Sequence, residues 1–136
     1  MRPEPSLVPG VPAEAAGQIL VVEDNAVNAL ILRAMLRKLG HEPLMASDGF
    51  EGIAMADRLR PRLVLMDLQM PRIDGIEAAR TIGSLEGGGK IVLVAVTASA
   101  APEVQDACED AGFACILAKP IVLGELHLLL RRYLDA

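Results

Sequence analysis

The sequence predicts an α/β fold with one parallel sheet, and two observations carry this prediction. From Ile19 onward, short apolar runs alternate with segments of helical period, as in domains where strands and helices follow one another. Four of the apolar runs are continuous in Val, Ile and Leu, as strands buried on both faces are. These runs end at Glu23, Asp67, Thr97 and Lys119. Because the carboxyl ends of parallel strands share one edge, these side chains should lie close together.

Size and composition limit the organisation of the chain. Its 136 residues, 52% of them hydrophobic, allow one domain with a proper core. Residues 1–17 contain four prolines and no period, so we expect a disordered leader or linker before a domain over residues 18–136. The net charge of -5 argues against a nucleic-acid partner. No apolar run reaches the roughly 20 residues of a membrane span, and two cysteines in apolar stretches suggest reduced thiols in a cytoplasmic protein.

The first predicted strand is Ile19–Glu23, and a helix follows it. Asn25 is suited to cap the start of this helix, and Gly40 is suited to end it. Apolar residues fall at helical spacing between these two positions: Val27, Leu30, Ile31, Ala34, Met35 and Leu39. An apolar stripe of this kind normally faces the sheet.

The second strand is predicted at Glu42–Ala46, at an edge of the sheet. Pro43 dictates the edge position, because proline has no N–H to donate to a ladder of hydrogen bonds. The second helix is predicted at Gly49–Leu59, where the pair Arg60–Pro61 ends it.

The rest of the chain continues the alternation. The remaining strands are predicted at Leu63–Asp67, Ile91–Thr97 and Ala114–Ala118. The remaining helices are predicted at Ile73–Ile82, Glu103–Ala111 and Val122–Leu134. Three glycines at 87–89 form a flexible turn before the longest apolar run, which we expect to be a central strand. Right-handed crossovers then favour a doubly wound, flavodoxin-like sheet of strand order 2-1-3-4-5, with helices on both faces.

Three carboxylates would meet at the carboxyl edge of this sheet. Glu23, Asp24 and Asp67 repel one another at that distance, and a divalent cation would relieve the repulsion. Oxygen ligands without Cys or His favour Mg²⁺, which keeps several waters and prefers a partner phosphate. The alternative is that Asp24 or Asn25 only caps the first helix and Asp67 only starts a turn. Acids from two strand ends, with Lys119 on a third, favour a shared site.

Polar groups suited to bind a phosphoryl group surround these acids. Lys119 could neutralise a carboxylate or bind a phosphoryl oxygen, and Pro120 favours a tight turn with a cis bond. Thr97 offers a hydroxyl, although Thr is also simply a good strand residue. The loop at 70–75 should shape the pocket and present the backbone carbonyl of Gln69 to a metal.

The motifs are Val21-Val-Glu-Asp-Asn25, Leu65-Met-Asp-Leu-Gln-Met-Pro-Arg-Ile-Asp-Gly75, Val96-Thr-Ala98 and Ala118-Lys-Pro120. In order and spacing they resemble the receiver domain of two-component response regulators. The resemblance covers about residues 18 to 136. The Glu-Asp-Asn start and the Thr-Ala-Ser stretch look most like the receivers of hybrid sensor histidine kinases.

The resemblance implies a role for each residue of the pocket. Asp67 would take a phosphoryl group from the phosphohistidine of a histidine kinase or a histidine phosphotransfer protein. Asp24, Asp67 and the Gln69 carbonyl would bind Mg²⁺, while Glu23 would order metal-bound water. The residues that would hold the phosphoryl oxygens are Thr97 and Lys119. The chain would then be a signalling phosphoacceptor, not an enzyme, that switches contacts with a downstream protein partner.

One position departs from the family pattern. Receivers usually carry Tyr or Phe three positions before the Lys, and here that position is Ile116. A pseudo-receiver that signals without phosphorylation is therefore an alternative, although Asp24, Asp67 and Lys119 argue against it. An aspartate-nucleophile phosphatase is a third reading. Enzymes of that kind carry the motif Asp-x-Asp at this strand end, whereas the second residue after Asp67 is Gln69.

Overall fold

The computed structural model describes residues 18–99 and 101–134, so the leader expected at 1–17 lies outside the described residues. The strands are β1 (Ile19–Val22), β2 (Leu44–Ala46), β3 (Leu63–Asp67), β4 (Val92–Thr97) and β5 (Phe113–Ala118). All pairs are parallel and the order is β2-β1-β3-β4-β5, which confirms the predicted topology. The run expected to be a central strand is β4, an interior strand, whereas β3 occupies the middle.

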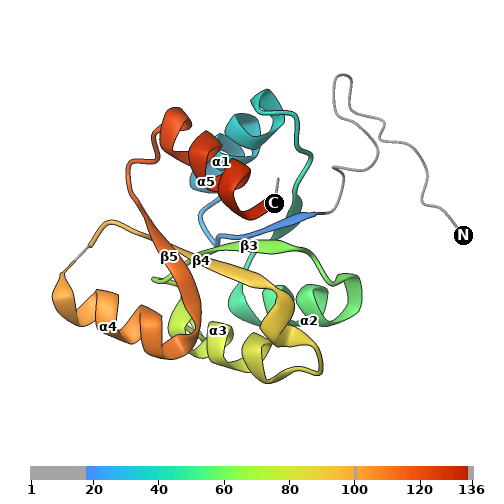
Figure 1. The fold of residues 1–136 in the computed structure, drawn as a ribbon, viewed down its shortest axis with the longest axis vertical. Helices are drawn as coiled ribbons and strands as arrows, with labels where there is room; N and C mark the ends of the chain where they lie inside the picture. Colours follow the sequence, from blue (N-terminus) through green and yellow to red (C-terminus); the bar gives the residue numbers. More distant parts are fainter. Residues whose placement is uncertain (1–17, 100, 135–136) are drawn as a thin grey trace, which may run out of the picture.

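Helices cover both faces of the sheet, as predicted. They are α1 (Ala26–Lys38), α2 (Gly49–Leu59), α3 (Gly75–Ser84), α4 (Pro102–Ala111) and α5 (Leu123–Leu134). Figure 1 shows α1 and α5 on one face and the other three helices on the opposite face. The expected glycine turn contains a short 3₁₀ helix, Gly88–Lys90. No helix in the described part of the chain is long and apolar enough to cross a membrane.

The strands supply two cores, one on each face. Val21 and Leu65 pack with the core under α1 and α5, while their neighbours Val22 and Met66 pack with the core under the other three helices. All four side chains are fully buried. Burial of a side chain of this kind contributes about 2 kcal/mol, so the strands behind the site form its rigid support.

Side-chain caps set where the helices begin. The Asn25 side chain accepts from the Asn28 N–H at 2.9 Å, which confirms the predicted cap of α1. The Asp74 side chain accepts from the Glu77 N–H at 2.9 Å, so α3 begins at Gly75, two residues later than predicted. Pro43 directly precedes β2, which lies at an edge as expected.

The apolar stripe predicted for α1 does not face the sheet as a whole. Val27, Leu30 and Ile31 are 65%, 66% and 54% exposed. The side chains that α1 buries are Leu32 and Leu36, which the spacing argument left out. Apolar residues occupy two sides of this helix, and packing on the sheet uses only one of them.

Candidate functional site

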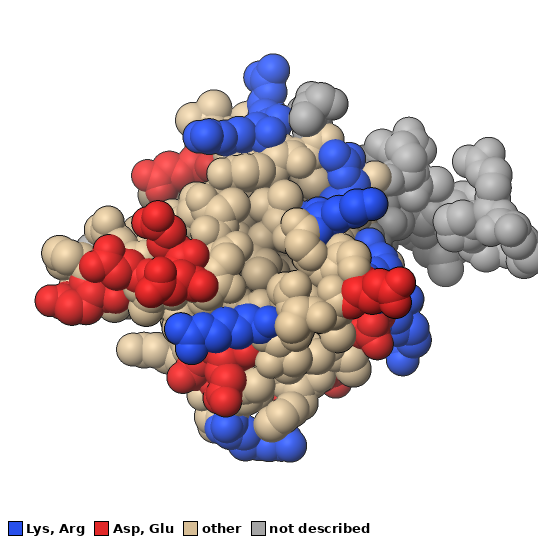
Figure 2. All heavy atoms as spheres, turned by 60° about the horizontal axis from the view of Figure 1, so that its bottom comes forward, with Lys and Arg blue, Asp and Glu red and all other residues tan. Residues whose placement is uncertain are grey.

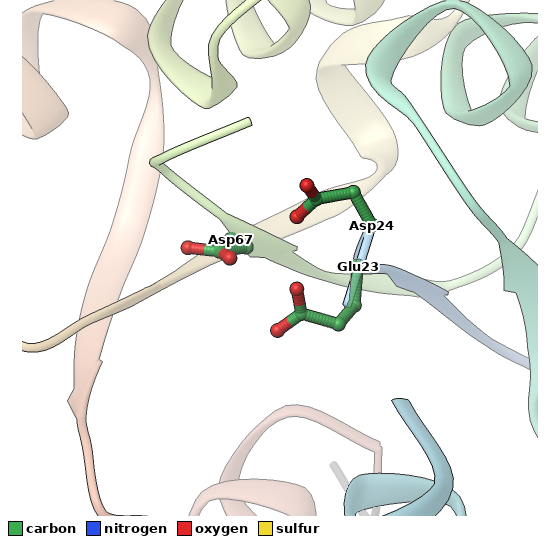
Figure 3. Close-up of side chains that lie close together, drawn as sticks. All are labelled: Glu23, Asp24 and Asp67. Carbon is green, nitrogen blue, oxygen red and sulfur yellow. The ribbon is translucent and has the colours of Figure 1, made fainter. Parts of the chain in front are cut away.

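Three carboxylates meet beyond the ends of β1 and β3. Glu23 and Asp24 directly follow β1, and Asp67 is the last residue of β3. Val22 is in register with Met66, so the two strands end side by side. One carboxylate oxygen from each acid lies within 4.8 Å of the others (Figure 3). Glu23 and Asp67 are each 6% exposed, whereas Asp24 is exposed, so the cluster opens to solvent on one side.

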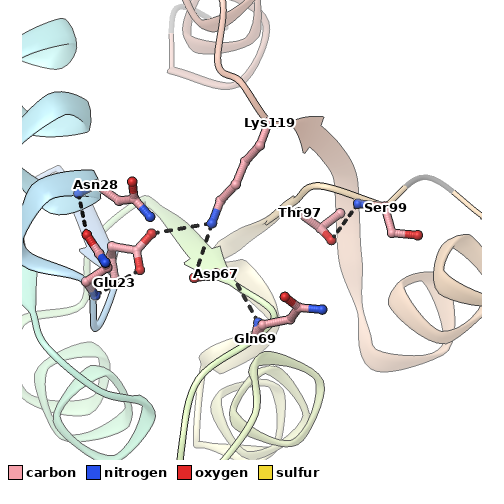
Figure 4. A network of polar contacts seen from close by, with 8 residues as sticks. Glu23, Asn28, Asp67, Gln69, Thr97, Ser99 and Lys119 are labelled. Carbon is pink, nitrogen blue, oxygen red and sulfur yellow. Dashed lines mark hydrogen bonds and ion pairs between the residues drawn. The ribbon is translucent and has the colours of Figure 1, made fainter.

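Lys119 lies over the two buried acids. Its Nζ is 3.3 Å from Asp67 Oδ2 and 3.6 Å from Glu23 Oε1 (Figure 4). The residue follows β5, and its peptide bond to Pro120 is cis. The ammonium partly balances the acids from strands β1 and β3, so the sequence-predicted cation and anions do share one pocket.

Glu23 is the acid whose titration the pocket changes most clearly. Burial raises the pKa of Glu23 from 4.5 to about 7, and the nearby Asp67 carboxylate adds to the rise. The Asn25 N–H, which donates to Glu23 Oε2 at 3.1 Å, and the Lys119 ammonium act in the opposite direction. The charged form of Glu23 therefore lacks sufficient compensation from this chain alone, and an added cation would stabilise it.

Two further predicted residues border the acids. The Gln69 N–H donates to Asp67 Oδ1 at 3.1 Å, so each oxygen of the Asp67 carboxylate has a separate partner. Thr97 ends β4 and is 4% exposed, and its hydroxyl oxygen accepts from the Ser99 N–H at 3.2 Å. The Thr97 carbonyl accepts from the Lys119 N–H at 2.9 Å, which ties the ends of β4 and β5 together.

The loop between β3 and α3 lies close behind Asp67. The Gly75 N–H donates to the Leu68 carbonyl at 3.0 Å and closes the loop. A Cβ on Gly75 would lie 2.6 Å from the Asp67 carbonyl oxygen and 2.8 Å from the Leu68 Cα. Only glycine fits at this approach of two backbone segments, so Gly75 fixes the position of the loop relative to Asp67.

The donor set fits Mg²⁺. It consists of three carboxylates from adjacent strand ends, and no Cys or His belongs to the cluster among the described residues. Hard divalent cations prefer oxygen ligands of this kind, and a partly open site leaves room for water. Of the three acids only Asp24 is exposed, so water could reach a bound ion from its side, while Glu23 and Asp67 are buried.

A cleft of about 400 Å³ adjoins the acids on the side of α1. Besides Glu23 and Lys119, its lining includes Asn28 and Ile31 from α1 and Ile121 from the β5–α5 connection. No motif in the sequence marks these three residues as functional. Ile31 belongs to the stripe predicted for α1, but its outward position depends on the rotation of the helix, which the spacing alone does not determine.

The sequence matches the family described as "Response regulator receiver domain" over residues 19–131. The chain is 35% identical over 129 residues to the peroxide stress-activated histidine kinase mak1 of Schizosaccharomyces pombe, covering 90% of this chain and 8% of that protein. It is 37% identical over 121 residues to the transcriptional regulatory protein PdtaR of Mycobacterium tuberculosis, covering 87% of this chain and 58% of that protein. The chain thus spans less than two thirds of these relatives.

Solved structures show the same fold. One is the receiver domain of the sensor histidine kinase PA1611 from Pseudomonas aeruginosa, with a TM-score of 0.82 and 39% identity over 88% of this chain and 99% of that one. That structure has a magnesium ion coordinated in the active-site cleft. Another is the Saccharomyces cerevisiae receiver domain of Ssk1 in complex with the histidine phosphotransfer protein Ypd1, with a TM-score of 0.80 and 29% identity over 88% and 89% of the two chains.

Proposed function

The chain belongs to the response regulator receiver family, and from this we propose that Asp67 accepts a phosphoryl group from a phosphohistidine in a two-component phosphorelay. The observation that supports this most strongly is the pairing of a buried Asp67 with Lys119 at 3.3 Å, inside a cluster of acids. The protein acts as a signalling phosphoacceptor, which loses the phosphoryl group slowly, and not as an enzyme with turnover.

The residues of the pocket divide the work of the transfer. An oxygen of Asp67 forms a bond to phosphorus while the bond from phosphorus to the histidine nitrogen breaks. The Lys119 ammonium and the Thr97 hydroxyl then bind oxygens of the transferred group, where negative charge collects. The Gln69 N–H holds the Asp67 carboxylate in one orientation before and during the transfer.

Mg²⁺, held by Asp24, Asp67 and the Gln69 carbonyl, would add positive charge at the phosphoryl oxygens and neutralise the acids. Glu23 contributes the buried negative charge that draws the ion in and orders its waters. The support for this part is the 4.8 Å cluster of carboxylate oxygens, together with the magnesium ion in the similar PA1611 receiver domain.

The exposed face of α1 is the surface that we assign to the phosphohistidine partner. Val27, Leu30 and Ile31 are more than half exposed, and Ile31 also lines the cleft that reaches Glu23 and Lys119. An apolar surface beside the phosphoacceptor suits a partner that must be held while its histidine reaches Asp67. The similar Ssk1 receiver domain was crystallised with a histidine phosphotransfer protein, which supports a partner of this class.

Output passes through contacts with a downstream protein. The exposed residues of α4 include four acids, Glu103, Asp106, Glu109 and Asp110. Figure 2 shows acidic side chains gathered at the left of the molecule, the side on which α4 lies in Figure 1. Such a surface repels nucleic acid and suits a basic protein surface.

The two free thiols fit a reducing, cytoplasmic location.

Intact-mass measurement with acetyl phosphate and Mg²⁺ tests the proposal. We expect one added phosphoryl group on the wild type and none on Asp67→Asn, because the amide is no nucleophile for phosphorus. A pseudo-receiver predicts no labelling of either protein. Labelling of Asp67→Asn at the wild-type level would contradict the assignment of Asp67.

A second arm of the same experiment tests the partner surface. Leu30→Glu places a charge on the exposed face of α1, away from the acids. It should slow transfer from a phosphohistidine protein and leave labelling by acetyl phosphate unchanged, since the small donor needs no docking surface. Glu103→Lys on α4 is the matched control, and transfer to it should proceed as to the wild type.

A further inference from the structure

Arg72 has an uncommon backbone conformation in the loop that follows Asp67. Its φ is 72°, and Arg60 is the only other non-glycine residue with positive φ in the described part of the chain. The Ile73 N–H donates to the Pro71 carbonyl at 2.8 Å, which makes Arg72 the centre of a three-residue turn. Turns of this kind with positive φ are rare and strained, and they persist where the surroundings enforce them.

The Arg72 side chain connects this turn to the start of α2. Its Nη1 lies 3.2 Å from Asp48 Oδ2, and its guanidinium carbon lies 5.0 Å from the centre of the Phe50 ring. Asp48 Oδ1 accepts from the Glu51 N–H at 2.8 Å, so the same carboxylate caps α2 and holds Arg72. The backbones are also close, because a Cβ on Gly49 would lie 3.2 Å from the Ile73 carbonyl oxygen.

The loop is thus fixed on two sides. On the inner side, the Gln69 N–H binds the Asp67 carboxylate (Figure 4), and the Gly75 N–H binds the Leu68 carbonyl. On the outer side, the contacts of Arg72 with Asp48 and the Phe50 ring attach the turn to α2. Gln69 is itself part of the inner attachment and lies three residues before Arg72, so the contacts of Arg72 limit how the Gln69 backbone can turn.

We propose that Arg72 is a positioning residue for the magnesium site: its contacts with Asp48 and Phe50 hold the loop so that the Gln69 carbonyl faces the ion. This inference rests on the proposed function, because it takes the Gln69 carbonyl as a ligand. Arg72 touches neither the ion nor the phosphoryl group. Residues that orient metal ligands typically change metal affinity by about 10-fold or more when they are lost.

Calorimetric titration of Mg²⁺ into Arg72→Gly tests the inference. Glycine adopts positive φ without strain, so the melting temperature in EDTA should change little while the Kd for Mg²⁺ rises about tenfold. A role in stability alone predicts the opposite pattern, a lower melting temperature with unchanged Kd. Arg60→Gly is the matched control: φ is 50° there, and Arg60 has its own ion pair, at 3.0 Å to Asp57. Its Kd should equal that of the wild type.

Asp48→Asn provides an independent check, because asparagine also caps helices but cannot pair with a cation. This variant should also have a higher Kd for Mg²⁺ than the wild type. The double variant with Arg72→Gly should bind Mg²⁺ no more weakly than Arg72→Gly alone. Wild-type Kd values for both single variants would overturn the positioning role while wild-type labelling by acetyl phosphate keeps the proposed function intact. A wild type that binds no Mg²⁺ would overturn both.

Discussion

The two halves of the pocket are built differently. The acids come from β1 and β3, whose residues are buried along their whole length. Thr97 and Lys119 come from β4 and β5, where β5 is an edge strand with exposed and half-buried residues and the pairing shifts register between Leu93 and Val94. A groove of about 610 Å³ runs beside β5, with Ile116 in its lining.

We expect this difference to separate the part of the pocket that binds the ligand from the part that moves in response to it. The acid half holds its charges in place before any ligand arrives, because the Gln69 N–H donates to Asp67 and the Asn25 N–H donates to Glu23. The other half has free volume next to Ile116, where receivers usually carry an aromatic ring. We therefore expect a change at Thr97 and Lys119 to reach β5 and α4, while the acid half resists movement.

The largest effect that we expect concerns the buried charge of the acid half. In EDTA, the free energy of unfolding should fall by about 3 kcal/mol as pH rises from about 4.5 to about 7, because folded Glu23 keeps its proton up to a pKa of about 7 and unfolded Glu23 loses it at 4.5. Denaturant unfolding over this pH range measures it. Glu23→Gln lacks the titrating group, so its curve should lose this decline, and parallel curves for the two proteins would contradict the account.

Magnesium should stabilise the same half by a smaller amount. At a concentration of about ten times Kd, a ligand that binds only the folded state adds about 1.4 kcal/mol, or several degrees in melting temperature.

Without Mg²⁺, Asp67→Asn should melt above the wild type, since it removes one of three repelling charges and leaves the Glu23–Lys119 pair at 3.6 Å. Mg²⁺ should also raise the melting temperature of the variant by less than that of the wild type. If the only role of Asp67 were to stabilise the turn, the variant would melt below the wild type, and Mg²⁺ would change the melting temperature of neither protein.

In the β4–β5 half we expect movement instead of a change in stability. Beryllofluoride, which mimics the phosphoryl group, should shift backbone amide signals from Ser99 to Glu103 and at Ile116. The physical reason is the groove beside Ile116, which leaves space for a new rotamer. NMR spectra with and without beryllofluoride measure this, with the buried β1 residues Ile19 and Leu20 as the internal reference. Shifts confined to the residues that touch the ligand would show that the two halves do not differ in this respect.

The smallest effect should come from residues 1–17, which we propose to be a leader that belongs to neither half. Deleting them should change the free energy of unfolding by less than about 1 kcal/mol, because four prolines and the lack of a period predict no helix or strand that would pack on the domain. Denaturant midpoints of the full chain and of residues 18–136 measure the difference. A larger loss would show that this segment packs on the domain.

The topology and the acid cluster could be predicted because both follow from local patterns. Continuous apolar runs identify strands buried on both faces, and Glu23 and Asp67 stand where two of these runs end. The orientation of α1 could not be predicted, since the residues from Val27 to Leu36 are apolar on two sides and the sheet selects one. Arg72 and Asp48 are 24 positions apart, and their contact depends on a turn with positive φ, so no local sequence pattern predicts it.

No stretch of the chain contains the pocket by itself. Glu23, Asp67, Thr97 and Lys119 lie far apart in the sequence and meet only when four strands pair in register. A truncated or partly folded copy has no site even if Asp67 is intact. Under the proposed function, the labelled fraction at saturating phosphodonor would therefore count native molecules, and phosphoryl uptake would measure the amount of folded protein in any preparation. In a cell, misfolded copies would accept no phosphoryl group and would therefore transmit no signal.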